Sequence, residues 1–136
     1  MADVVTTLKI ADDIIKFYNV DGYELKAESL TECLSNTRLP SLAGHIAQQS
    51  LLLSEEATQD DAFDGAGELL KVAGMAALKS KNRTLSRTVT ARHRGVLDLK
   101  KDFAAAERAR ETLQTDPDDA AANQKLGTYL CVSRNR

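Results

Sequence analysis

Few residues in this sequence have the types and spacing that catalysis or metal binding requires. His45 and His93 are the only histidines, and the two cysteines, Cys33 and Cys131, lie far apart without a CxxC pair. Because zinc sites draw their ligands from characteristically spaced Cys and His residues, no metal site is predicted. The serines form neither a G-x-S-x-G elbow nor a Ser-x-x-Lys pair, and no glycine-rich phosphate loop occurs. We therefore expect no catalytic, cofactor-binding or metal-binding residue, and no enzyme activity.

Charged residues in the middle of the chain are separated into an acidic and a basic block. Residues 39–70 hold six acids and no Lys or Arg, whereas residues 69–97 hold seven basic residues and no acid. Arg83, Arg87 and Arg94 recur at i, i+4 and i+11, which places them on one face of a helix. The planar arginine fork binds carboxylates and phosphates well, so these three residues are the candidate contact to an anion or a partner.

Two other interpretations of these blocks stay open. The arginines can form a solvated helix face, with basic residues placed favourably near a helix C-terminus. Alternatively, the acidic turn of one molecule meets the basic turn of another, which would give salt-sensitive self-association.

Composition indicates a globular protein with no general attraction to polyanions. A length of 136 residues suits a single domain over 1–136. With 43% hydrophobic and 28% charged residues, the composition differs from that of a disordered chain. The formal net charge of −2 gives no overall attraction to nucleic acid or an anionic membrane. Aromatic residues make up only 4%, too few for a platform that stacks single-stranded bases.

No targeting or membrane segment is predicted. The sequence has no run of 18 apolar residues, the length needed to span a bilayer, and its start lacks a basic signal-peptide region. The localisation is therefore unknown from the residues themselves.

Apolar residues recur at helical spacing along nearly the whole chain, which predicts an all-α fold. We expect six helices, over residues 3–19, 22–35, 40–58, 61–80, 83–115 and 117–132. The range 83–115 has no proline and one glycine, Gly95, so it is predicted to be one unusually long helix, with a break near Gly95 as the alternative.

Residues at the predicted helix ends and inside the fourth helix lead to further predictions. Pro40 suits the first turn of the third helix, and Asp60 or Asp61 is expected to cap the fourth. Asp116 as the cap and Pro117 at the first position are expected to open the last helix. Glycines within the fourth helix weaken it, so we expect a neighbouring helix to approach closely there: Gly65, Gly67, Gly74.

The junction before the last helix resembles that of a tetratricopeptide (TPR) repeat. Leu113-Gln-Thr-Asp-Pro117 looks like the proline turn that closes helix B, and Leu126-Gly127-Thr-Tyr-Leu130 looks like the Leu-Gly pair of the next helix A. In the same frame, residues 47–80 fit a second repeat, although the two frames lie farther apart than the family's period. The resemblance implies antiparallel TPR-like hairpins whose helix-A faces line a groove.

A closer resemblance covers nearly the whole chain. The motifs Phe17-Tyr-Asn-Val-Asp21-Gly-Tyr-Glu-Leu-Lys-Ala27, Asp61-Ala-Phe-Asp-Gly-Ala66 and Gly127-Thr-Tyr-Leu-Cys131 are similar to a helical module of large planctomycete proteins. Those proteins are often predicted to be exported, and the module often lies beside a lectin-like sandwich domain. The resemblance implies either a fragment of a larger, exported protein or a short form, and it implies no activity.

Together these observations predict a non-catalytic protein-interaction or structural spacer module. The expected partner is another protein or a neighbouring domain of the same larger protein, and self-association is a further expectation. The alternative is an anion- or polyanion-binding module that uses Arg83, Arg87 and Arg94.

Overall fold

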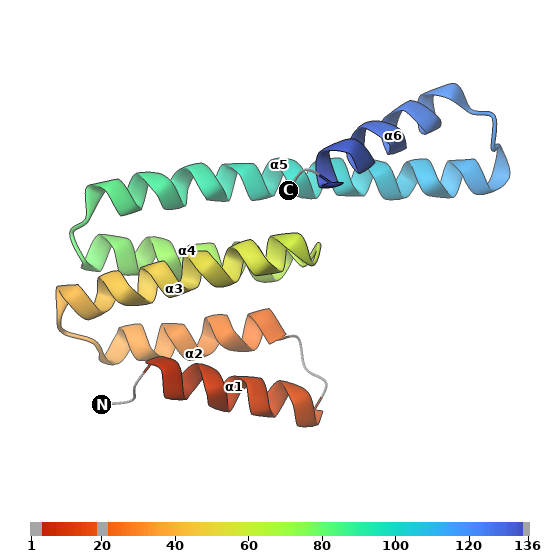
Figure 1. Cartoon of the computed structure of the whole chain (residues 1–136). Helices are drawn as coiled ribbons and strands as arrows, with labels where there is room; N and C mark the ends of the chain where they lie inside the picture. Colours follow the sequence, from red (N-terminus) through yellow and green to blue (C-terminus); the bar gives the residue numbers. More distant parts are fainter. Residues whose placement is uncertain (1–3, 19–21, 135–136) are drawn as a thin grey trace. The chain divides into compact units, whose positions relative to one another are not determined.

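The computed structural model describes residues 4–18 and 22–134, and every regular element in these ranges is an α-helix (Figure 1). The six helices are α1 (Val4–Tyr18), α2 (Gly22–Asn36), α3 (Pro40–Gln59), α4 (Phe63–Lys79), α5 (Arg83–Thr115) and α6 (Ala120–Arg134). The predicted all-α class, the six helices and the long helix are therefore confirmed. Residues 19–21, part of the first planctomycete-like motif, lie outside the described residues.

Two compact units make up the chain, Met1–Val96 and Leu97–Arg136. Helix α5 is continuous from Arg83 to Thr115, so the backbone does not break at Gly95. The single domain over 1–136 stays a prediction, and the two units are described in turn.

The core of the first unit is built on small residues of α3 and α4. These two helices form the most extensive helix pair of the unit. Alanine side chains with no exposed surface lie on both helices, and they let the two backbones approach closely: Ala43, Ala47, Ala57, Ala66, Ala73, Ala76, Ala77. Larger side chains fill the space around them: Leu30, Ile46, Leu69, Leu70. Such dense packing of apolar surface is the main stabilising contribution to the unit.

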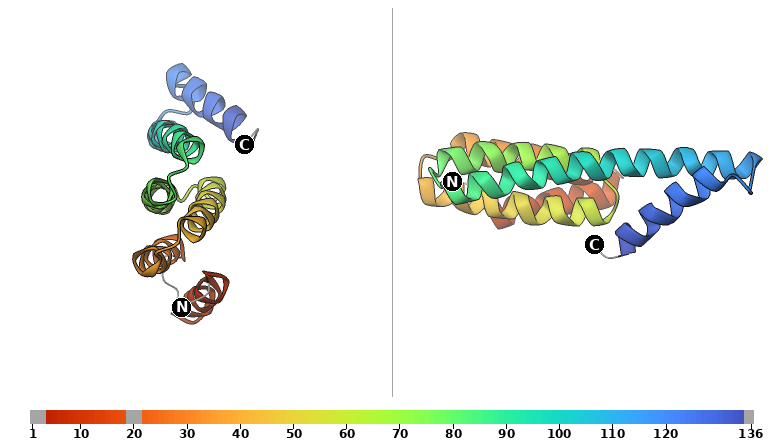
Figure 2. Two further views of the ribbon diagram at one scale, coloured as in Figure 1. Left: turned by 90° about the vertical axis from the view of Figure 1, so that its left-hand side faces the viewer. Right: turned by 90° about the horizontal axis from the view of Figure 1, so that it is seen from above.

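Helix α2 is central to this unit because it contacts α1, α3 and α4. The view along the helix axes in Figure 2 (left) shows α2 and α4 on one side of the unit, with α1 and α3 on the other. The close approach expected at the glycines of α4 is found at Gly65, where an added Cβ would lie 2.5 Å from the Cβ of Tyr23. It is not found at Gly67, where an added Cβ would have no atom within 4 Å.

The turns after α3 and α4 have the same backbone geometry. In the first turn, Asp61 has a left-handed φ of 56°, and the Ala62 N–H donates to the Ala57 carbonyl at 2.8 Å. In the second, Lys81 has a φ of 58°, and the Asn82 N–H donates to the Ala77 carbonyl at 3.3 Å. Both are Schellman motifs, which satisfy the last carbonyls of a helix.

Two of the expected helix caps are wrong. Ala62 is the N-cap of α4 and makes no side-chain hydrogen bond, while Asp60 is the C-cap of α3. Asp60 serves another role, because its carboxylate accepts a hydrogen bond from the Tyr23 hydroxyl. In contrast, Pro40 does lie in the first turn of α3, as predicted.

The second unit is a hairpin of the later part of α5 with α6. Its interior contains Phe103 and Tyr129, whose rings meet edge to face with centroids 5.9 Å apart. Asp119 caps α6, since its Oδ1 accepts a hydrogen bond from the Ala122 N–H at 2.7 Å. Helix α6 therefore begins after the turn that contains Pro117, and the expectation of Asp116 as the cap is wrong.

Candidate functional site

A groove of about 600 Å³ lies between α2 and α4 in the first unit. Helix α2 supplies Glu24, Glu28 and Glu32 to it, and these residues recur every four positions along one edge. This spacing places the three side chains on one face of the helix. Helix α4 supplies Glu68 and Lys71 to the groove. The four carboxylates and one ammonium give the groove a formal charge of −3.

The floor of the groove is apolar. Ala27 of α2 and Val72 of α4 are 4% and 3% exposed, whereas Met75 of α4 is 48% exposed. Methionine is flexible and polarisable, and such side chains adapt to differently shaped partners. The two hydroxyls in the groove already donate to carbonyls of their own helix, that of Thr31 at 2.8 Å and that of Ser35 at 2.9 Å. Because these donors are satisfied, covering the floor would leave no new unpaired hydroxyl donor.

The carboxylates of the groove differ in their partners. Glu68 Oε1 lies 2.6 Å from the Lys71 ammonium nitrogen, so these two residues form an ion pair within α4. Glu28 and Glu32 are exposed and form no ion pair within residues 4–18 and 22–134. These two carboxylates are therefore the groove's available acceptors for a cation.

The arginines predicted from the sequence lie elsewhere, on the outer face of α5. Arg87 and Arg94 line one shallow depression of about 340 Å³, together with Ser86, Thr90 and Ala91. Arg83 begins α5 and is exposed, but it does not line this depression. In the described part of the chain none of the three arginines forms an ion pair. The structure thus brings two of the three predicted residues to one depression.

An ion pair between α3 and α5 also joins the acidic and basic blocks. Arg92 of α5 lies 3.4 Å from the Glu55 carboxylate of α3. Both side chains are about half exposed, so this ion pair contributes at most about 1 kcal/mol to stability.

Sequence reasoning missed the groove because it concentrated on residues 39–70, whose only groove acid is Glu68. The signal that could have found it is the repeat Glu24, Glu28, Glu32 at helical spacing. That signal alone marks an acidic helix edge, and only the packing of α2 beside α4 turns the edge into a groove.

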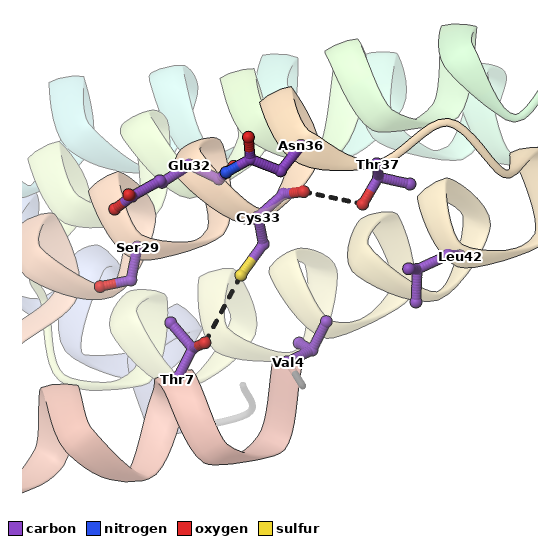
Figure 3. Close-up of a pocket in the computed structure, with 8 residues that line it drawn as sticks. All are labelled: Val4, Thr7, Ser29, Glu32, Cys33, Asn36, Thr37 and Leu42. Carbon is purple, nitrogen blue, oxygen red and sulfur yellow. Dashed lines mark hydrogen bonds between the residues drawn. The ribbon is translucent and has the colours of Figure 1, made fainter. Parts of the chain in front are cut away.

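A second, smaller cavity of about 150 Å³ lies where α1 meets α2 (Figure 3). The Cys33 thiol is buried there, with its Sγ 3.6 Å from Thr7 Oγ1, and the Thr37 hydroxyl donates to the Cys33 carbonyl at 2.7 Å. Figure 3 shows Glu32 and Asn36 along the α2 edge of this cavity, apart from the thiol. The Cys33 thiol thus donates its hydrogen bond from a buried position between α1 and α2.

Across residues 4–18 and 22–134, no three His, Cys, Asp or Glu side chains are grouped so that they could hold a metal ion. Similarly, none of the described helices combines the length and the apolar character needed to cross a bilayer.

Comparisons of the chain with protein-family models, curated proteins and solved structures find no match. The resemblances to TPR repeats and to the planctomycete module therefore stay predictions. The candidate function rests on the surfaces of the chain itself.

Proposed function

We propose that this chain is a non-catalytic protein-interaction module whose docking surface is the groove between α2 and α4. The observation that carries the proposal is the combination of an acidic rim with an apolar floor that includes Met75. Charged rims orient a partner and raise its association rate, while buried apolar contacts supply affinity.

The chemistry of the groove defines its partner. A segment with basic residues on its edges and small or apolar residues between them would pair with Glu28 and Glu32 while covering Ala27 and Met75. An amphipathic helix meets this requirement, because anchors at i, i+3, i+4 and i+7 share one face. Such a segment can belong to another protein or to a neighbouring domain of the same larger protein, in which case the module also acts as a spacer.

Selection from a displayed library of random helical peptides tests this proposal. We expect the wild-type chain to enrich basic, amphipathic sequences, and Glu28→Gln/Glu32→Gln to weaken their binding about tenfold or more, since it removes two charge-assisted contacts. Glu56→Gln/Glu111→Gln is the matched control, because it removes two exposed carboxylates outside the groove. Equal binding by both double variants, or no enrichment of basic sequences, would contradict the proposal.

A second candidate function is anion or polyanion binding through Arg83, Arg87 and Arg94. It is supported by the exposure of all three arginines and by the depression that Arg87 and Arg94 share. Nucleic acid is not the expected polyanion, because aromatic residues make up only 4% of the sequence, too few for a platform that stacks on bases.

Retention on a heparin column in low salt tests the anion-binding candidate. Arg83→Glu/Arg87→Glu/Arg94→Glu should abolish retention if the three arginines form the site. Unchanged retention of this charge-reversal variant would reject the candidate.

A further inference from the structure

We infer that the groove between α2 and α4 is occupied by the basic face of α5 from a second copy of the chain. This inference rests on the proposed docking function and names its partner. The inference requires that the two surfaces match in charge, length and shape. It also requires that the basic face of α5 cannot reach the groove of its own copy.

The charges of the two surfaces are equal and opposite. The groove carries a formal charge of −3 from four carboxylates and one ammonium. The basic face of α5, defined by Arg83, Ser86, Arg87, Thr90, Ala91 and Arg94, carries three guanidinium groups and no acid. Guanidinium and carboxylate groups form strong, bidentate hydrogen bonds, and these favour pairing of such surfaces over pairing with neutral ones.

The two surfaces also have the same length. On α2 the groove extends from Glu24 to Ser35, and on α5 the basic face extends from Arg83 to Arg94. Each interval corresponds to roughly 16 Å along a helix axis. The arginines at i, i+4 and i+11 can therefore reach the carboxylates of α2 along the whole groove.

The shape of the basic face allows it to approach the groove closely. Between the arginines lie only small side chains, Ser86, Thr90 and Ala91. The Ser86 and Thr90 hydroxyls donate to carbonyls of their own helix at 3.1 and 3.0 Å, so their burial would leave no unpaired donor. This smooth ridge faces the exposed Met75 side chain, which can adapt to it.

A copy cannot place this face in its own groove. Val89 and Val96 are the buried residues of α5 in the first unit, and Val89 lies against α4, with its Cγ1 3.8 Å from an added Gly74 Cβ. Around the helix, these valines stand roughly 180° from Arg87. The arginines therefore point away from the groove of their own unit and are exposed to a second copy.

Sedimentation of the full chain with swapped charges tests the inference. The groove variant is Glu24→Lys/Glu28→Lys/Glu32→Lys, and the helix variant is Arg83→Glu/Arg87→Glu/Arg94→Glu. We expect the wild type to associate at about 0.1 M salt and to dissociate at about 1 M, where the Debye length falls from about 10 Å to about 3 Å.

Each variant alone should associate at least about tenfold more weakly, because like charges then face each other. An equimolar mixture should restore association, since the basic groove of one variant accepts the acidic helix of the other. Asp13→Lys/Glu56→Lys/Glu111→Lys is the charge-matched control and should associate like the wild type. A milder groove variant, Glu24→Gln/Glu28→Gln/Glu32→Gln, should also associate more weakly than the wild type, and it replaces the lysine variant if that variant does not fold.

A monomeric wild-type chain, or a mixture that fails to associate, would overturn the inference. If such a chain still bound the peptides selected by display, the groove would remain a docking site for a different protein. Loss of both kinds of binding would reject the proposed function as well.

Discussion

Gly65 is a residue whose missing side chain has a structural reason. It lies where α4 meets Tyr23, the second residue of α2, and that contact helps to set the separation of the two helices that form the groove. Gly67, two residues later, is open on the side where a Cβ would project. The two glycines of one helix should therefore respond in opposite ways to the same substitution.

Gly65→Ala should lower the free energy of unfolding by about 1–3 kcal/mol, because the added Cβ would lie 2.5 Å from the stiff Cβ of Tyr23. Gly67→Ala should raise it by about 0.5–1 kcal/mol, since alanine has the higher helix propensity and meets no atom. Urea unfolding followed by circular dichroism measures both values. Stabilisation by both substitutions would show that α2 and α4 are not in close contact at Gly65.

Left-handed residues after α3 and α4 allow a second test at the residue scale. Lys81→Gly should stabilise the chain by about 1 kcal/mol, because glycine adopts the positive φ of 58° without the Cβ clash of lysine. Asp61 has a φ of 56°, and aspartate tolerates this left-handed region better than lysine does. Asp61→Gly should therefore stabilise the chain less than Lys81→Gly. Thermal unfolding of the two variants ranks them, and a loss of stability in Lys81→Gly would contradict the Schellman geometry.

A lysine of α4 bonds to the C-terminal end of α2. The Lys79 ammonium group donates to the Leu34 carbonyl at 2.8 Å, and this places a positive charge at the C-terminus of α2. A cation at this position stabilises a helix by interacting with its dipole and by satisfying a terminal carbonyl.

Lys79→Met should therefore lower the free energy of unfolding by about 1 kcal/mol. The control is Lys71→Met, which removes a lysine bonded to Glu68 of its own helix and should change stability by less than about 0.5 kcal/mol. Chemical denaturation measures the difference between the variants. Equal effects would mean that Lys79 contributes only a solvated charge.

Helical periodicity was sufficient to predict the elements, because each helix is amphipathic or built on small residues within its own sequence. Helix ends were harder to predict. Asp60, Asp61 and Asp116 are all acceptable caps by residue type, but the Schellman turn and the turn at Pro117 shift the actual starts to Phe63 and Ala120. A cap depends on the backbone path of the preceding turn, which residue type does not determine.

The groove was beyond prediction from sequence for a related reason. It combines Glu28 and Glu32 with Glu68 and Met75, and these come from helices that are not consecutive. The sequence shows which edge of each helix is acidic or apolar. It does not show that α2 packs against α4, because that contact joins helices separated in the sequence by α3.

At the scale of the whole chain, opposite charges are placed on surfaces that do not neutralise each other. The net charge of −2 conceals an acidic groove and a basic helix face, each with a formal charge of magnitude 3. Surfaces of this kind should interact with their partners in a salt-dependent manner. The small net charge therefore says little about what the chain binds.

The central claim is that the groove between α2 and α4 is a docking surface for a basic, amphipathic segment. Amide chemical-shift mapping during titration with a helical, arginine-bearing amphipathic peptide tests it most directly. The account predicts saturable shifts concentrated at residues 24–35 and 68–75, which Glu28→Gln/Glu32→Gln reduces and Glu56→Gln/Glu111→Gln leaves unchanged. Shifts that are absent, or that are confined to helices other than α2 and α4, would contradict it.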